Sequence, residues 1–202
     1  MTPAIMNIGV CGGTFDPFHR GHLEPVLAIR DQMQWERVIF VPAWHQPFKA
    51  DRTTASGYHR FAMAVLATQA DDSLYVSPME LERGGVSYTV ETLQELHEIY
   101  PDATFDWIIG DDNVSQLLEW KHPERLFALA RFIVLARGGP TPSPELAQRV
   151  TDGRLIYAQN DAVLISSTDI RARVKAGQPI DTMVDPAVSR YILHNGLYKE
   201  AS

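Results

Sequence analysis

Cysteine is almost absent from this sequence, which contains only Cys11. A single cysteine cannot form an internal disulfide, and its use here favours a reducing compartment. The first ten residues lack a basic segment followed by a long apolar run, so we expect no signal peptide. Stretches of about 18 consecutive apolar residues are also lacking, so we expect no transmembrane helix. Together these absences predict a cytoplasmic protein with no membrane partner.

The sequence also lacks a surplus of positive charge. Lysine and arginine number 18 against 25 aspartates and glutamates, which gives a net charge of −7 and a pI near 5.4. Proteins that bind nucleic acid neutralise its phosphates with a surplus of basic residues, so we expect no nucleic-acid partner. A few cations that converge on one place can still bind a small phosphate compound. The sequence leaves the oligomeric state open and is compatible with an oligomer.

The remaining composition is that of a folded globular protein. The chain has 202 residues, of which 45% are hydrophobic and 21% charged, and it shows no internal repeat or low-complexity tract. A chain of this length buries roughly 70% of its unfolded surface, which allows a core without disulfides or a structural metal. We therefore expect a single domain over residues 1–202.

Short apolar runs alternate along the chain with segments of helical periodicity. The expected strands are 5–11, 38–41, 74–76, 105–109 and 132–136, with strand-like residues again from Leu155. The expected helices are about 23–34, 60–69, 90–100, 167–176 and 186–195, and the expected long loops are 43–57 and 138–144. Continuous apolar strands between helices are typical of a parallel sheet covered on both faces. The sequence thus predicts an α/β, doubly wound, mostly parallel sheet.

In such folds ligands bind beyond the carboxyl ends of the strands, which directs attention to the turn after Cys11. Residues 12–22 read GGTFDPFHRGH, which is neither a P-loop nor a dinucleotide fingerprint. His19 and His22 lie three residues apart at an expected helix start, where both imidazoles can donate to one phosphate. A histidine pair within the core and a metal-ligand pair are the alternatives. The neighbouring sequence does not complete a zinc set, so we expect no metal site.

A second candidate phosphate-binding pattern lies at residues 165–171, which read ISSTDIR. Helix capping alone explains one serine or threonine before a helix. Capping does not explain three consecutive hydroxyl side chains followed by Arg171 one turn into the helix. Hydroxyls, helix-start amides and a forked guanidinium together make a suitable site for a polyphosphate.

The two patterns together resemble the paired signature of the HxGH nucleotidyltransferases, which have a Rossmann-like fold. The resemblance extends over almost the whole chain to one family among them, the bacterial nicotinate-nucleotide adenylyltransferases. Three further stretches carry it: SYTVETL at 87–93, IIGDDN at 108–113 with Trp120 eight positions after Asp112, and Tyr191-Ile192 with Leu197-Tyr198. The activity that the resemblance implies joins ATP and nicotinate mononucleotide into nicotinate adenine dinucleotide and pyrophosphate, within NAD biosynthesis.

The resemblance also implies roles for individual residues. It assigns catalysis to His19, His22 and Arg171, with the helices from about residue 166 completing the ATP site. It implies that Trp120 stacks on the pyridine ring and that the backbone amide of Thr89 receives the pyridine carboxylate. The implied ATP contacts are Gly12, Gly13, Thr14, Phe15, His19, His22, Gly110, Asp112, Ser166, Ser167, Thr168 and Arg171. The implied mononucleotide contacts are Asp16, Lys49, Tyr88, Thr89, Trp120 and Lys121.

The chain departs from the family pattern at two positions. The family usually has Pro-Pro-His before the basic residue at 49, whereas Phe48 precedes Lys49 here, and Glu91 stands where aspartate is usual. Phe48 removes a polar contact near the mononucleotide phosphate, and it is equally explained as an anchor of the loop on the core. Simpler roles also stay open for Trp120, as a packed surface aromatic, and for Asp112, as a helix N-cap.

The implied reaction is attack by a mononucleotide phosphate oxygen on the α-phosphorus of ATP. The second pKa of such a phosphate is about 6, so the nucleophile is already largely anionic near neutral pH and needs no strong general base. Catalysis then depends on alignment and on stabilising charge at the phosphoryl oxygens. Mg²⁺ is expected to arrive bound to the ATP phosphates, with few protein ligands.

Two other functions stay open at this point. A sister enzyme such as phosphopantetheine adenylyltransferase shares the paired signature, but it would not supply the 87–93 stretch or Trp120. A nucleotide-binding sensor without turnover belongs to another class, and the intact His19, His22 and Arg171 argue against it.

Overall fold

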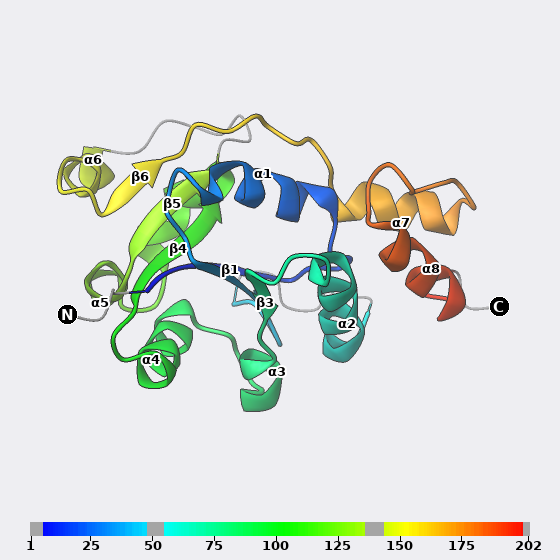
Figure 1. Ribbon diagram of the computed structural model, residues 1–202, viewed down its shortest axis with the longest axis horizontal. Coiled ribbons are helices and arrows are strands. Elements are labelled where there is room, and N and C mark those ends of the chain that lie inside the picture. Colours follow the sequence, from blue (N-terminus) through cyan, green and yellow to red (C-terminus); the bar gives the residue numbers. More distant parts are fainter. Residues whose placement is uncertain (1–5, 48–54, 136–143, 200–202) are drawn as a thin grey trace.

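The computed structural model describes residues 6–47, 55–135 and 144–199 and contains a six-stranded sheet with helices on both faces (Figure 1). The strands are β1 (Asn7–Gly13), β2 (Arg37–Pro42), β3 (Leu74–Val76), β4 (Thr104–Gly110), β5 (Arg131–Leu135) and β6 (Leu155–Tyr157). Their order is β3-β2-β1-β4-β5-β6, and each neighbouring pair is parallel. The predicted doubly wound α/β fold is therefore confirmed.

The helices include the expected long ones and several short ones that periodicity did not reveal. They are α1 (Arg20–Arg30), α2 (Gly57–Thr68), α3 (Met79–Arg83), α4 (Thr89–Ile99), the 3₁₀ helix η1 (Asp111–Glu119), α5 (Pro123–Leu129), α6 (Pro144–Thr151), α7 (Ser167–Lys175) and α8 (Pro186–His194). Pro123 is the first residue of α5, because a proline is tolerated where the amide has no helical partner. The proline therefore begins a new helix after η1 has ended at Glu119.

The central strands bury both of their faces. Val38 and Phe40 of β2 belong to an apolar core with residues of α1, α2, α7 and α8, whereas Ile39 and Val41 belong to a second core with residues of α4, η1 and α5. Figure 1 shows α1 on one side of the sheet and α3, α4 and α5 on the other. Because successive strand residues point to opposite faces, a strand buried on both sides requires the continuous apolar runs seen in the sequence.

The strand order changes direction at β1, which lies between β2 and β4. In open α/β sheets such a switch point opens a crevice at the carboxyl ends of the strands, where ligands bind. The segment after β1, residues 14–19, enters this crevice and leads into α1. The 3₁₀ helix η1 follows β4 at the same end of the sheet. The fold thus brings the segment after β1 and η1 to one edge of the sheet.

The two glycines at the end of β1 differ from expectation. The sequence predicts a strand that stops at Cys11 and a tight turn at Gly12-Gly13, but the strand continues through Gly13. A Cβ atom at Gly13 would lie 2.6 Å from Cε1 of Phe15, so the ring folds back onto the backbone where no side chain fits. Gly13 is required by close approach of an aromatic ring, and the turn comes after it.

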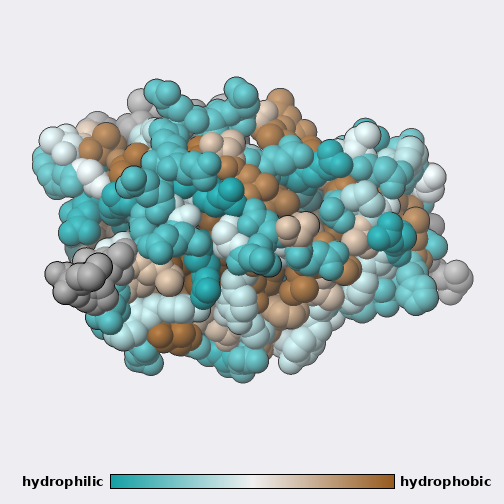
Figure 2. Space-filling model, in the orientation of Figure 1, coloured by the Kyte–Doolittle hydropathy of each residue, from teal (hydrophilic) through white to brown (hydrophobic). Residues whose placement is uncertain are grey.

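The surface is mixed in character on the side that Figure 2 shows. Hydrophilic residues are spread over this whole face, and hydrophobic residues lie among them in small groups. Among the helices that the structure describes, none combines the length and the apolar character needed to cross a membrane.

An ion pair with a buried carboxylate and a half-exposed arginine joins β4 to its neighbour β5. Asp106 of β4 is 0% exposed, and its carboxylate accepts hydrogen bonds from Nε and Nη2 of Arg131 and from Nε1 of Trp35, each at 2.7 Å. These hydrogen bonds raise the pKa of Arg131. Replacing Arg131 by methionine should lower the free energy of unfolding by about 2 kcal/mol or more, because it leaves a buried carboxylate without its cation. Urea denaturation measures this loss.

The matched control is Arg173→Met, which removes an arginine as exposed as Arg131 but paired at 3.1 Å with Asp169, whose side chain is half exposed. Exposed pairs contribute little, so this change should stay below about 1 kcal/mol. An equal loss of unfolding free energy in the two variants would contradict the role given to the buried carboxylate of Asp106.

Candidate active site

The histidine pair lies at the start of α1, in the crevice beyond β1. His19 is the N-cap residue, and Nδ1 of His22 accepts a hydrogen bond from the backbone amide of His19 at 3.2 Å. In the neutral ring of His22 the proton is therefore on Nε2, which can donate to a phosphate oxygen. The two imidazoles stack, with centroids 3.6 Å apart and planes at 22°. His19 is 3% exposed, so His22 is the more accessible of the two.

Aromatic rings hold this pair in place. Phe15 meets the ring of His22 edge-on with centroids 5.0 Å apart, and Phe18 lies 5.5 Å from it. Phe15 has a φ of 53°, in the left-handed region that residues with a side chain rarely adopt. Such a conformation costs on the order of 1–3 kcal/mol and persists only where the surroundings enforce it. The backbone after β1 is therefore strained, and its shape depends on neighbouring segments.

Helix α7 is one of those neighbours. Ser167 Oγ donates to the carbonyl oxygen of Pro17 at 3.2 Å, and Arg171 Nη1 donates to the carbonyl oxygen of Asp16 at 2.7 Å. Arg171 Nη2 also donates to Thr168 Oγ1 at 3.3 Å. Ser166 caps the helix by accepting from the amide of Asp169 at 3.0 Å. The structure thus brings together the two segments that the sequence singled out, although about 150 residues separate them.

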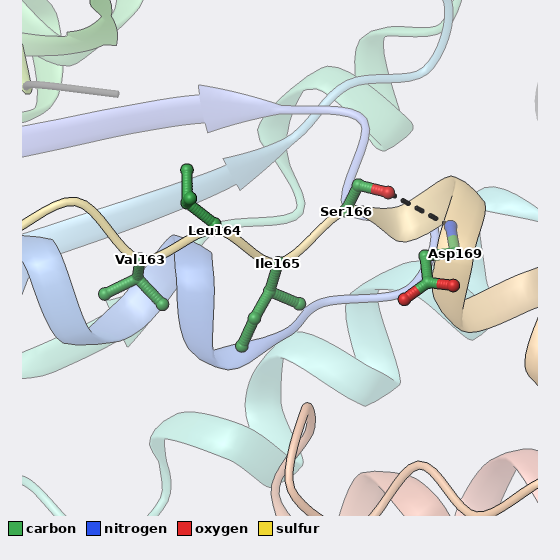
Figure 3. Close-up of a pocket in the computed structure, with 5 residues that line it drawn as sticks. All are labelled: Val163, Leu164, Ile165, Ser166 and Asp169. Carbon is green, nitrogen blue, oxygen red and sulfur yellow. Dashed lines mark hydrogen bonds between the residues drawn. The ribbon is translucent and has the colours of Figure 1, made fainter. Parts of the chain in front are cut away.

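A hollow of about 300 Å³ opens beside the start of α7 (Figure 3). It is lined by Val163, Leu164, Ile165, Ser166 and Asp169. Leu164 points away from Val163 and Ile165 in Figure 3, and it is 85% exposed. An aliphatic side chain this exposed, next to hydroxyl groups and a helix start, is suited to lie against an apolar part of a ligand.

A group of buried and partly buried polar side chains, Asp16, Arg60 and Tyr198, holds the loop after β1 by hydrogen bonds. Asp16 is 3% exposed, and its Oδ1 accepts from the hydroxyl of Tyr198 at 2.7 Å and from the amide of Ala55 at 3.3 Å. Arg60, 1% exposed, donates to the carbonyl oxygens of Thr14 at 2.6 Å, Trp44 at 3.3 Å and Ala55 at 3.3 Å. Burial lowers the pKa of Arg60. Burial and the charge of Asp16 raise the pKa of Tyr198, so its hydroxyl keeps its proton and donates.

The carboxylate of Asp16 therefore faces the protein interior. Its predicted contact with the mononucleotide stays a prediction, and the geometry favours a supporting role for this side chain. Thr14 Oγ1 is buried and has no hydrogen-bond partner among the described residues.

Three of the residues predicted to bind the mononucleotide, Tyr88, Thr89 and Lys121, lie together at the start of α4. The N-cap residue Tyr88 makes no side-chain capping bond, so its side chain does not occupy the first amides of the helix. Lys121 Nζ lies 4.1 Å from the centroid of the Tyr88 ring and 2.7 Å from Oε1 of Glu91. Trp120 is half-buried and meets Phe132 edge-on at 6.3 Å, so a packing role and a stacking role are both compatible with its position.

Glu80 is hydrogen-bonded to Thr92 in the first turns of α4. It is buried, accepts a hydrogen bond from Thr92 Oγ1, and burial raises its pKa. Ser87, just before α4, hydrogen-bonds to Glu80 and accepts from the amide of Trp44 at 3.0 Å. The start of α4 is thus tied to the segment after β2.

The segment after β4 differs in part from expectation. Gly110 is the N-cap of η1, so the alternative reading of Asp112 as a helix N-cap is wrong. Asp112 lies within η1 and is exposed, whereas Asp111 is buried. Phe48 and Lys49 lie outside the described residues. Within those residues, no group of three or more His, Cys, Asp and Glu side chains is arranged to hold a metal ion.

Sequence reasoning missed three contributors to this region, namely Arg60, Glu80 and the hollow beside Leu164. Arg60 and Glu80 occur in stretches that read as an ordinary helix and an ordinary loop, and only their burial marks them. Leu164 had one visible signal, an apolar VLI run at 163–165 directly before the hydroxyl cluster.

Comparison with known proteins shows the family to which this chain belongs. A family model described as cytidylyltransferase-like matches residues 10–173. A protein of Clavibacter michiganensis subsp. michiganensis (strain NCPPB 382) is 40% identical over 200 residues, which cover 98% of each chain. A protein of Thermoanaerobacter sp. (strain X514) is 38% identical over 201 residues, which cover 96% of this chain and 95% of the relative. Both relatives are named probable nicotinate-nucleotide adenylyltransferases.

A solved structure has the same fold. It is the Plasmodium falciparum nicotinic acid mononucleotide adenylyltransferase complexed with NaAD, with a TM-score of 0.75 and 20% identity. The match covers 96% of this chain and 97% of that chain, and at this identity it shows the fold alone. The sequence matches extend further, since they cover nearly the whole chain at close to 40% identity. The chain therefore belongs to the cytidylyltransferase-like nucleotidyltransferases and, among them, to the nicotinate-nucleotide adenylyltransferase family.

Proposed function

We propose that this protein transfers the adenylyl group of ATP to nicotinate mononucleotide, which forms nicotinate adenine dinucleotide and releases pyrophosphate in NAD biosynthesis. Membership of the family supports the reaction. One structural observation carries the proposal for the site: Arg171 of α7 bonds to the loop that carries His19 and His22, at the switch point of the sheet. Two potential phosphate-binding segments thus meet where ligands of this fold bind.

On the ATP side, we assign the triphosphate to the start of α1 and the start of α7. Nε2 of His22 and the guanidinium of Arg171 would donate to phosphoryl oxygens, with Ser166 and Thr168 beside them. The adenine base would lie in the hollow next to Leu164, where an exposed aliphatic side chain can cover one of its faces. Residues 1–202 would then act as one domain in which α7 and α8 complete the ATP site.

On the acceptor side, we assign the pyridine ring to the region of Trp120 and the pyridine carboxylate to the start of α4. A helix N-terminus favours an anion through its unpaired amides and its dipole. Lys121 lies over Tyr88 beside this helix start, with its charge balanced by Glu91.

The chemistry proposed needs no proton acceptor of unusual strength. The mononucleotide phosphate is largely anionic near neutral pH, so the site has to align it with the α-phosphorus and stabilise the charge that develops. The substrate would be ATP with its divalent cation, for which we propose Mg²⁺ because it binds phosphate oxygens and retains water. The single cysteine supports placing the reaction in the cytoplasm, where disulfides are rare.

Acceptor choice tests the proposal. We expect kcat/KM for nicotinate mononucleotide to exceed that for its amide by roughly ten- to a hundredfold, since a charge-assisted hydrogen bond contributes about 1.5–3 kcal/mol. Steady-state kinetics with the two acceptors at fixed ATP measure the ratio. A ratio near one, or one in favour of the amide, would show that the pocket does not recognise the carboxylate as proposed.

Two variants of Thr89 locate the recognising group. Thr89 is the first residue of α4, a position where proline is accepted. Thr89→Pro removes the backbone amide and should reduce the ratio toward one, whereas Thr89→Ala keeps the amide and should leave the ratio within about twofold. A ratio that survives in Thr89→Pro would assign recognition to another group.

A further inference from the structure

We infer that Tyr198 is a positioning residue for adenylyl transfer: its hydroxyl holds Asp16, and through Asp16 it holds the loop after β1 and Arg171 in their working geometry. This inference rests on the proposed function. The residue lies 182 positions after Asp16 in the sequence, and its hydroxyl donates to Oδ1 of Asp16 at 2.7 Å.

Asp16 is held through its side chain, which also accepts from the amide of Ala55, and through its carbonyl oxygen, and the two groups face different parts of the site. Its side chain accepts from Tyr198, and its carbonyl oxygen accepts from Arg171 Nη1 at 2.7 Å. A shift of Asp16 would therefore displace Arg171, which we assign to the ATP phosphates. The same shift would displace His19, which lies three residues later at the helix start.

The backbone next to Asp16 needs such support. Phe15 has a φ of 53°, and a residue with a side chain keeps such a conformation only when its surroundings enforce it. Arg60 fixes the residue before Phe15 by donating to the carbonyl oxygen of Thr14 at 2.6 Å. Tyr198 fixes the residue after it. Hydrogen bonds thus hold the residues on both sides of Phe15. The bond from Tyr198 can be removed by deleting one oxygen atom, in Tyr198→Phe.

The test compares Tyr198→Phe with Tyr191→Phe in the full-length protein. Tyr191 is a matched control, because it packs against the same apolar core and its hydroxyl shares a hydrogen bond with Nδ1 of His59 at 2.9 Å. That bond joins α8 to α2 and does not involve the loop after β1. Each variant loses one hydroxyl and keeps the ring.

We expect Tyr198→Phe to lower kcat and kcat/KM for ATP and nicotinate mononucleotide by about tenfold, with KM values within about twofold of the wild type. Misplacement of groups that act in the transition state has this signature. Tyr191→Phe should retain kcat within about twofold. The melting temperatures of the two variants should fall by similar amounts, which separates positioning from general stability.

Asp16→Ala provides a second arm. In that background the addition of Tyr198→Phe should change kcat by less than about twofold, since the hydroxyl acts through Asp16. Full kcat in Tyr198→Phe, an equal loss in Tyr191→Phe, or additive losses in the double variant would overturn the inference.

A third arm does not depend on turnover. Hydrogen exchange, read by mass spectrometry on a peptide that spans residues 12–24, should be faster in Tyr198→Phe than in the wild type and unchanged in Tyr191→Phe. Unchanged exchange in Tyr198→Phe would overturn the inference even if the wild type were inactive. An inactive wild type would itself count against the proposed function, so the two failures are distinguishable.

Discussion

Replacement of His22 by alanine is expected to lower kcat by about 10²-fold or more, the scale measured when one preorganised donor to a developing oxyanion is removed. Nδ1 of His22 accepts from the amide of His19, which leaves Nε2 as the ring donor beside the start of α1. Its ring is fixed by stacking on His19 and by contacts with Phe15 and Phe18. The measurement is kcat at saturating ATP and nicotinate mononucleotide.

Two comparisons make this result interpretable. His22→Ala also removes the capping bond, which costs about 0.5–2 kcal/mol of stability, so His22→Asn is included because its side-chain oxygen can still accept from the amide of His19. Both variants should lose activity, and the asparagine should recover part of the stability. His194→Ala, an exposed histidine in the last turn of α8, should keep kcat. Turnover by His22→Ala at nearly the wild-type rate would remove His22 from the phosphate site.

Arg171→Ala is expected to raise KM for ATP by about 10²-fold, and Arg171→Lys by about tenfold. A charge-assisted bond contributes about 1.5–3 kcal/mol, and lysine keeps the charge but loses the planar fork. The planar guanidinium matters here because Nη1 donates to the carbonyl oxygen of Asp16 and Nη2 donates to Thr168 Oγ1. KM for the acceptor should change by less than about twofold. Titration of initial rates with each substrate separates the two constants.

Arg173→Lys is the control for this series. Arg173 lies on the same helix and pairs with Asp169 at 3.1 Å, with both side chains about half exposed. Its replacement should leave the ATP titration unchanged. Identical ATP titrations for Arg171→Lys and the wild type would place Arg171 outside the ATP site.

Much of the sheet could be predicted from the sequence because its strands are buried on both faces. The run at 38–41 is uninterrupted, the run at 105–109 is broken only by Asp106, and β3 matches its predicted bounds of 74–76. The short helices α3, α5 and α6 span one to two turns, which is too few residues for a helical period to show. The strand end at Gly13 was missed because its cause is a contact with Phe15, two residues outside the strand.

The candidate site could likewise be predicted from the sequence only in part. The two signature segments could be found because each carries its hydroxyl, imidazole or guanidinium groups within a few consecutive residues. Their support could not be found, since Tyr198 and Arg60 meet Asp16 and Thr14 only in the folded chain. An arginine within a helical pattern, or a tyrosine beyond the last helix, carries no sign of a buried hydrogen bond. Local patterns therefore predict the groups that face a ligand, while the interactions that orient those groups emerge from the packing.

The central claim is adenylyl transfer, and product analysis tests it most directly. The purified wild-type protein is incubated with ATP, Mg²⁺ and nicotinate mononucleotide, and the products are quantified by chromatography with mass detection. We expect nicotinate adenine dinucleotide and pyrophosphate in equal amounts, with no product when the mononucleotide is omitted. Pyrophosphate release without the dinucleotide, or tight ATP binding without any product, would contradict this claim.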